Sequence, residues 1–187
     1  MKMKTIMLTI ADYPDHPDWA EMIRANRDRF CKLVGGYVVY EFTPPIDTGR
    51  MWVRVPLILE MLEAYDRVMW VDADAVLFDM VNEEDLPDRL AFAHDAGGIN
   101  DGVTVTVKRD VLLWKVIWEL RHLKDGDPII QGLHANGVLR SVNPAHDVLP
   151  LDLWNSRWPN FYMKIRHFAA ENNRYELVKR ACGGERI

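Results

Sequence analysis

The segment Val68-Met-Trp-Val-Asp-Ala-Asp-Ala-Val76 decides the fold, because a run of apolar residues ends in two carboxylates, Asp72 and Asp74. The run over residues 68–71 predicts a buried strand. Successive side chains on a strand point to opposite faces, so two acids spaced i, i+2 face the same way. At the carboxyl end of a strand that direction usually opens into a crevice. Two like charges there require a cation, and Mg²⁺ or Mn²⁺ prefers oxygen ligands that it shares with substrate phosphates. We therefore expect a metal-bridged phosphate site.

Length and composition indicate one folded domain over residues 1–187. A chain of 187 residues with 49% apolar residues is long enough to bury one sizeable hydrophobic core but too short for two well-buried ones. The net charge of -5, with Lys and Arg scattered along the chain, offers no basic face for a nucleic-acid backbone. Nucleic acid is therefore not an expected partner.

The two cysteines and the apolar runs bear on location. Cys31 and Cys182 are far apart and have no Cys/His spacing typical of zinc or of a disulfide framework. A reducing compartment fits this usage best. No segment approaches the ~20 apolar residues of a membrane span, and no leader pattern precedes residues 4–10. We expect a cytoplasmic protein without a membrane-spanning segment, of unknown oligomeric state.

The first half of the chain alternates strand and helix patterns. Strands are predicted over residues 4–10, 37–42 and 68–71, and helices after Asp18 and over residues 55–65. Asp18 and Glu21 have the spacing of a capping box, and Gly35-Gly36 ends the first helix. This alternation predicts an α/β fold, with a mixed, mostly parallel sheet and helices on both faces. Ligands of such sheets gather beyond the carboxyl ends of the strands, where Asp72 and Asp74 lie.

The second half is less regular. Residues 90–94 and 102–108 are candidate strands around a glycine-rich segment, 95–102, whose glycines permit positive φ or close backbone approach. Asp110 is placed to cap an apolar helix that reaches about residue 123. From Asn143 onward we expect loop-rich structure closed by aromatic residues.

At this level of detail the chain resembles a known family of enzymes. The tract over residues 65–78 resembles the DxD region of nucleotide-sugar glycosyltransferases with the GT-A (Rossmann-like) fold. The similarity is greatest to the retaining group that includes glycogenin, bacterial lipooligosaccharide galactosyltransferases and fungal and plant galactosyl, mannosyl and xylosyl transferases. Other short segments match in the family's order: Thr9-Ile-Ala-Asp12, Trp52-Val-Arg54, Ile99-Asn-Asp-Gly-Val103, Gln131 after an Asp-Pro pair, Leu149-Pro to Trp154-Asn155, and Ile165-Arg-His-Phe-Ala169. Ala170 stands where the family usually has Gly.

The resemblance implies a single-domain glycosyltransferase that moves a sugar, with retention, from a nucleotide-sugar donor to a glycan or other hydroxyl acceptor. UDP-sugars are the favoured donors, and Mn²⁺ or Mg²⁺ is the implied cofactor. A metal ion at this position stabilises the charge that develops on the leaving diphosphate. The implied roles are metal ligation by Asp72, Asp74 and His167, donor binding by Thr9, Asp12, Arg54 and Asp72, and catalytic contact with the donor sugar by Asn100, Asp101 and Gln131.

Two other readings of the same residues stay open. Asp72-Ala-Asp74-Ala-Val76 also fits the nucleophile motif of haloacid-dehalogenase-type, Mg²⁺-dependent phosphatases, with Asp72 as nucleophile. That motif normally closes the first strand, whereas two strands are predicted before it here. A module that binds sugar nucleotides or glycans without catalysis would show the same pattern. Each residue also has a structural alternative, such as turn chemistry for Asn100 and Asp101 or an exposed helix position for Arg54.

Overall fold

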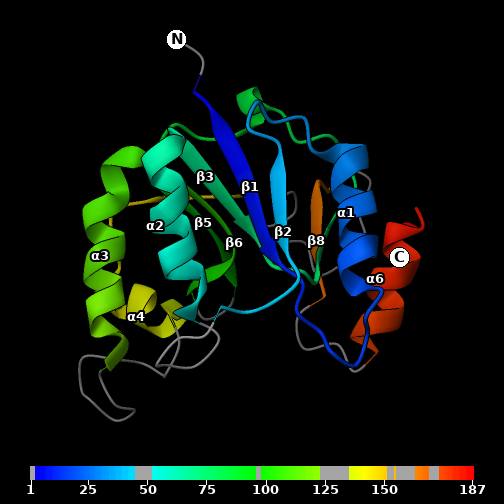
Figure 1. Cartoon of the computed structure of the whole chain (residues 1–187). Coiled ribbons are helices and arrows are strands. Elements are labelled where there is room, and N and C mark those ends of the chain that lie inside the picture. The colour runs from blue at the N-terminus through cyan, green and yellow to red at the C-terminus, as the bar shows by residue number, and fades with distance from the viewer. Residues whose placement is uncertain are drawn as a thin grey trace.

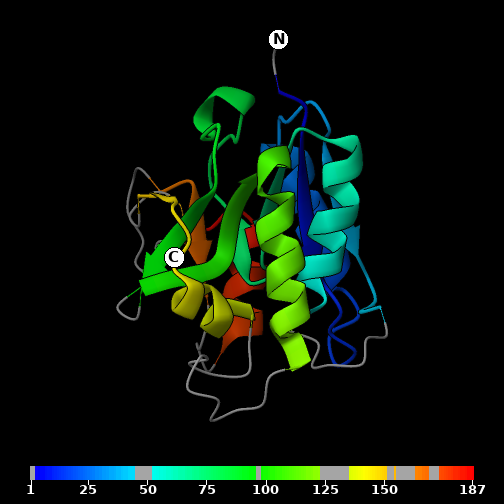
Figure 2. The same cartoon turned by 90° about the vertical axis from the view of Figure 1, so that its left-hand side faces the viewer.

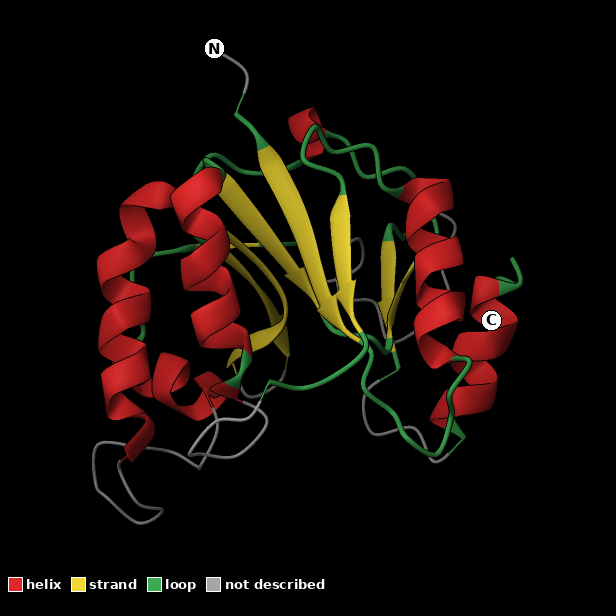
Figure 3. Cartoon of the chain, viewed as in Figure 1, coloured by secondary structure: helices red, strands yellow, loops and turns green. Residues whose placement is uncertain are grey.

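The computed structural model describes residues 3–44, 52–95, 98–122, 135–150, 154, 163–168 and 173–187. The strands are β1 (Thr5–Ile10), β2 (Tyr37–Tyr40), β3 (Arg67–Val71), β4 (Ala75–Leu77), β5 (Ala91–Asp95), β6 (Gly98–Val107), β7 (Asp147–Val148) and β8 (Ile165–His167). The helices are α1 (Trp19–Phe30), α2 (Arg54–Ala64), α3 (Val111–Glu119), α4 (Ala135–Val142) and α6 (Arg174–Cys182), with short 3₁₀ turns between some of them. Figure 3 shows helices on both sides of the strands.

The strands form a central six-stranded sheet, in the order β2-β1-β3-β6-β5-β7, and a small sheet of β4 and β8. Strand β1 is parallel to β2 and β3, and β5 is parallel to β7, whereas β6 runs antiparallel to both β3 and β5. The predicted α/β class with a mixed, mostly parallel sheet is therefore confirmed.

Two groups of helices flank the sheet. Helices α2, α3 and α4 lie on one side of it in Figure 1, and α1 and α6 lie on the other. Figure 2, turned by 90°, shows α2 and α3 side by side in front of the strands. No helix in the described part of the chain combines the length and the apolar character that crossing a membrane needs.

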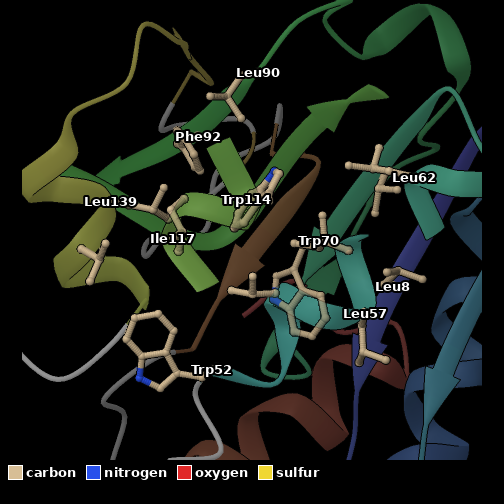
Figure 4. Packing of buried hydrophobic residues seen from close by; sticks show 14 of the residues in the cluster. Leu8, Trp52, Leu57, Leu62, Trp70, Leu90, Phe92, Trp114, Ile117 and Leu139 are labelled. Carbon is tan, nitrogen blue, oxygen red and sulfur yellow. The ribbon is translucent and has the colours of Figure 1, made fainter. Parts of the chain in front are cut away.

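Alternation along the strands separates two apolar layers. Ile6 and Leu8 of β1 and Val68 and Trp70 of β3 pack with α2, α3 and Trp114 in one cluster, part of which Figure 4 shows. The intervening Met7, Met69 and Val71 face a second cluster that includes the small sheet. Each fully buried large apolar side chain stabilises the fold by about 1.5–3 kcal/mol. Because β3 is covered on both sides, its carboxyl end is held rigidly.

The predicted capping interactions of two helices are wrong. Asp18 is the N-cap of α1, but its side chain makes no capping hydrogen bond and instead accepts one from the Tyr175 hydroxyl at 2.7 Å. Asp110 precedes α3, yet its carboxylate turns back to the Val107 backbone N–H and the Thr106 hydroxyl. In both cases the carboxylate accepts hydrogen bonds from other groups and not from the backbone N–H groups of the first helical turn.

The second half of the chain contains more regular structure than the pattern predicts. Strand β6 begins at Gly98 rather than at residue 102, so Asn100 and Asp101 lie in a strand. The glycine-rich segment does use positive φ, at Gly98, where φ is 100°. Strand β8 and helix α6 lie in the segment that we expected to be loop-rich. Strand β8 has only three residues, too few for period-two alternation to be detected.

Candidate active site

The end of β3 brings two acidic segments together. Val71 pairs with Val103 of β6, and the Asp72 backbone N–H donates to the Gly102 carbonyl oxygen at 2.8 Å. Because β6 runs antiparallel to β3, residues 100 and 101 continue past the point where β3 ends. Asp101 therefore lies near Asp72, although 29 positions separate them in the sequence.

His167 reaches the same place through the small sheet. Ala75 of β4 pairs with His167 of β8, and the Phe168 backbone N–H donates to the Asp74 carbonyl oxygen at 2.9 Å. The His167 Nε2 atom lies 3.1 Å from Asp74 Oδ1 and 3.9 Å from Asp72 Oδ2. Asp74 and His167 are buried, and Asp72 is half-buried.

Gly102 permits the close approach of His167. A Cβ atom on Gly102 would lie 2.4 Å from His167 Cε1 and 2.9 Å from its Nδ1, closer than real Cβ contacts occur. The Asn100 Oδ1 atom would also be 3.0 Å away, and it already accepts a hydrogen bond from the Gly102 N–H at 2.9 Å. Any larger residue at position 102 would therefore displace the imidazole.

Asp72, Asp74 and His167 form a cluster that could hold a divalent metal ion. One ligand atom from each residue lies within 4.8 Å of the other two, so a single ion can reach all three. Two carboxylate oxygens suit hard ions such as Mg²⁺ and Mn²⁺, and an imidazole nitrogen adds affinity for a transition metal. The donor set thus fits the metal expected from the sequence, without deciding which ion binds.

Arg54 holds the carboxylates that surround this cluster. Its Nη1 atom lies 2.9 Å from Asp101 Oδ2 and donates to the Asp101 carbonyl oxygen at 3.0 Å, and its Nη2 lies 3.6 Å from Asp72 Oδ1. The Arg54 Cζ atom lies 5.3 Å from the centre of the Trp70 ring, and the Trp70 indole N–H donates to Asp72 Oδ1 at 2.7 Å. The exposed-helix alternative for Arg54 is wrong, because only 5% of its side chain is exposed.

Two residues of the site, Trp70 and Arg174, were missed from the sequence. Trp70 lies on β3 and precedes Asp72, which directly follows the strand, by two positions, and this i, i+2 spacing could have identified it. Arg174, at the start of α6, donates from Nη1 to Asp74 Oδ2 at 3.0 Å. Nothing in the sequence distinguishes Arg174 from other basic residues, since its position depends on how α6 packs against the rest of the protein.

The two acids of the motif have opposite pKa shifts. Burial raises the pKa of Asp72 above its ordinary value, and the nearby charge of Asp74 adds to this against the opposing effect of Arg54. Burial also acts to raise the pKa of Asp74, but hydrogen bonds and charge from His167 and Arg174 outweigh it, and the pKa is lowered. Asp74 is therefore the more firmly ionised of the two acids.

The cluster lines a cavity of about 300 Å³. Six of the predicted site residues line it together, namely Arg54, Asp72, Asp74, Asn100, Asp101 and His167, along with Tyr13, Trp70 and Arg174. Thr9 is buried within β1 and does not line the cavity. Asp12 is also outside the lining and accepts a hydrogen bond from the backbone N–H of Thr43, a lining residue, at 2.9 Å. Gln131 lies outside the described residues.

Comparisons with known proteins identify the fold. Neither a family model nor a curated protein matches the chain. Among solved structures, the chain is similar to a glycosyltransferase involved in the glycosylation of the major capsid of PBCV-1, with a TM-score of 0.70 and 15% sequence identity. The match covers 94% of this chain and 98% of that one. The fold is that of a glycosyltransferase. At this identity the comparison shows the fold alone, and the chemistry depends on the residues of the site.

Proposed function

We propose that this protein is a metal-dependent glycosyltransferase that uses a nucleotide-sugar donor, with UDP-sugars favoured. The observation that carries the proposal is the Asp72–Asp74–His167 cluster, which lines a cavity beyond the carboxyl end of β3 in a fold of the glycosyltransferase type. Ligands of open α/β sheets bind in this place. A divalent ion held there would stabilise the charge that develops on a leaving diphosphate.

The protein's own residues supply binding and orientation. Arg54, which lines the cavity, pairs with Asp101 at 2.9 Å and lies 3.6 Å from Asp72, so its charge orients both carboxylates. Asp101 and Asn100 offer oxygen and amide groups of the kind that sugar hydroxyls need. We assign these two, with Gln131, to the donor sugar, and Asp12, which accepts a hydrogen bond from the backbone of the lining residue Thr43, to the nucleotide. Thr9, buried within β1, is not assigned a ligand contact. Transfer to a glycan or other hydroxyl acceptor with retention completes the proposal.

Thermal unfolding with nucleotides provides the test. We expect UDP to raise the melting temperature in the presence of Mn²⁺ or Mg²⁺ but not with EDTA, because ligands stabilise the state that binds them. UDP, GDP and ADP, followed by their sugar conjugates, would identify the donor. Turnover is then measured as metal-dependent release of the nucleoside diphosphate with candidate hydroxyl acceptors.

Two variants make the test specific. Asp74→Asn should abolish metal-dependent nucleotide stabilisation while the apo protein stays folded. Asp79→Asn, an exposed acid nearby that does not line the cavity, should leave it unchanged. Equal Mn²⁺-assisted nucleotide affinity in Asp74→Asn and the wild type would contradict the metal assignment. Cleavage of an aryl phosphate would favour the phosphatase, and nucleotide binding without sugar release would favour a non-catalytic module.

A further inference from the structure

Arg174 and Arg54 differ in how firmly they are held. Arg54 is 5% exposed and donates to a carboxylate and a backbone carbonyl of the same residue, Asp101. Arg174 has a side chain that is 40% exposed, and its one described ion pair is with Asp74 Oδ2 at 3.0 Å. The partly exposed Arg174 guanidinium regains hydration when it leaves Asp74, whereas the buried Asp74 carboxylate then needs another cation in its place. A divalent metal ion supplies that charge, so Arg174 is the group that can be exchanged, whereas Arg54 is buried against Asp101.

The position of Arg174 conflicts with a metal ion. Asp74 has two oxygens, of which one faces His167 Nε2 at 3.1 Å and the other receives the Arg174 guanidinium. A divalent cation bound by Asp72, Asp74 and His167 would share the Asp74 carboxylate with a second positive group. Two cations on one buried carboxylate repel each other, and the more exposed one is the one that can move.

A diphosphate group bound in the cavity would give a displaced Arg174 a new anionic partner. The residue lines the same cavity as the three ligands, so a ligand bound in that cavity lies within reach of its guanidinium. Guanidinium groups bind phosphate oxygens in a bidentate manner. A diphosphate on the metal ion would therefore offer Arg174 a replacement for the carboxylate that it gives up.

We propose that Arg174 competes with the divalent metal for Asp74 and is transferred to the diphosphate of the ligand, which couples metal binding to nucleotide binding. In the absence of nucleotide the guanidinium weakens metal binding, and the diphosphate removes this competition. By linkage, each ligand then raises the affinity for the other by the same factor. The metal half of this inference needs only the metal cluster, and the diphosphate half rests on the proposed function.

The test compares Arg174→Gln with the wild type in direct binding measurements. The electron paramagnetic resonance signal of free Mn²⁺ reports metal affinity without nucleotide, and we expect Arg174→Gln to bind Mn²⁺ about two- to fivefold more tightly. Calorimetry with UDP at saturating Mn²⁺ should show about tenfold weaker nucleotide binding in the variant, because a charge-assisted contact is lost. The coupling between the two ligands should fall accordingly.

Arg180→Gln is the matched control, since Arg180 lies on the same helix, is exposed, pairs with Glu185 and does not line the cavity. It should match the wild type in both titrations. Unchanged or weaker Mn²⁺ binding in Arg174→Gln would overturn the competition. Tighter Mn²⁺ binding with unchanged UDP affinity would overturn the transfer to the diphosphate. If the wild type bound Mn²⁺ but neither UDP nor GDP, the proposed function and the diphosphate half would fail, and the metal titration alone would decide the competition.

Discussion

A buried arginine faces acidic side chains near each end of β3, Arg67 of the strand itself at the amino end and Arg54 of α2 near the carboxyl end, yet the two places differ in charge balance. At the amino end, Arg67 pairs with Glu83 at 2.6 Å, and its remaining donors reach the Thr5 hydroxyl and the backbone carbonyls of Leu86, Pro87 and Glu83. Beyond the carboxyl end, three acids, Asp72, Asp74 and Asp101, face Arg54, the partly exposed Arg174 and His167. We refer to these as the Arg67 cluster and the Asp72 site.

The Arg67 cluster has the features of a structural charge cluster, and the Asp72 site has those of a functional one. In the Arg67 cluster every guanidinium nitrogen has an acceptor, and neither Arg67 nor Glu83 lines the cavity. In the Asp72 site the acids line a cavity and one of them, Asp72, has a raised pKa. The Arg67–Glu83 pair, with every guanidinium nitrogen hydrogen-bonded, fixes a loop to the sheet. In the Asp72 site, by contrast, acidic side chains line a cavity, and a cation can bind there.

The largest expected effect is on the Arg67 cluster. Arg67→Met leaves Glu83 buried without its cation, which should lower the free energy of unfolding by about 3–5 kcal/mol. Urea unfolding at neutral pH measures the loss. Arg89→Met serves as the control, because the Arg89–Asp147 pair is 60% and 34% exposed and should contribute only about 0.2–1 kcal/mol. Equal losses in the two variants would mean that the Arg67 cluster is no more than a surface ion pair.

The features that depend on local order in the chain could be predicted from the sequence. Asp72 and Asp74 were found because local order is sufficient: an apolar run, then two acids at strand spacing, defines both the strand end and the direction of the side chains. The α/β class followed from strands and helices that alternate in the first half. Apart from Gln131, which lies outside the described residues, and Thr9 and Asp12, the predicted site residues lie in one cavity.

The missed features depend on contacts between distant segments. Strand β8 pairs with β4 across about 90 positions, and neither three-residue strand has a periodic pattern of its own. Arg174 reaches Asp74 only because α6 packs beside the small sheet. Nothing local in the sequence marks Glu83 and Arg67 as a buried pair, since burial of a charge cannot be seen until its partner is placed. Asp18 was assigned to a helix cap from its spacing to Glu21, and its actual partner, Tyr175, lies 157 positions away in the sequence.

Gly102→Ala tests the geometry of the Asp72 site with the next largest effect. The new Cβ would overlap the His167 imidazole and push it away from Asp74, so we expect Mn²⁺ affinity to fall by about 10–100-fold, as when the groups that orient a metal ligand are removed. Mn²⁺ titration measures the change. In a His167→Ala background the same substitution should add almost nothing, because the two act through one side chain. If the losses of Mn²⁺ affinity caused by the two substitutions were fully additive, Gly102→Ala would not act through the His167 side chain.

Asp72→Asn should separate stability from function. Because burial raises the pKa of Asp72, its charged form is disfavoured in the folded protein, and a neutral isostere should raise the free energy of unfolding in EDTA by about 0.5–2 kcal/mol. Mn²⁺ binding should weaken at the same time. Urea unfolding with and without Mn²⁺ measures both. In the Arg67 cluster, Glu83→Gln should instead lower the free energy of unfolding. If Asp72→Asn also lowered it, the proposed difference between the Arg67 cluster and the Asp72 site would be wrong.

The smallest effect concerns the acid sensitivity of the Arg67 cluster. Burial acts to raise the pKa of Glu83, but hydrogen bonds from Thr5, the Val34 backbone N–H and Arg67 outweigh it, so the pKa is lowered. A carboxylate with a lowered pKa binds its proton more readily in the unfolded chain. Its stabilising contribution is therefore complete above the unfolded pKa of about 4.3 and is lost as the pH falls through the lower folded value. The free energy of unfolding should fall more steeply below about pH 4.5 in the wild type than in Glu83→Gln, where nothing titrates at this position. If the free energy of unfolding had the same pH dependence in both proteins, the hydrogen bonds to Glu83 would not favour its charged form. The pairing of charges would then no longer distinguish the Arg67 cluster from the Asp72 site.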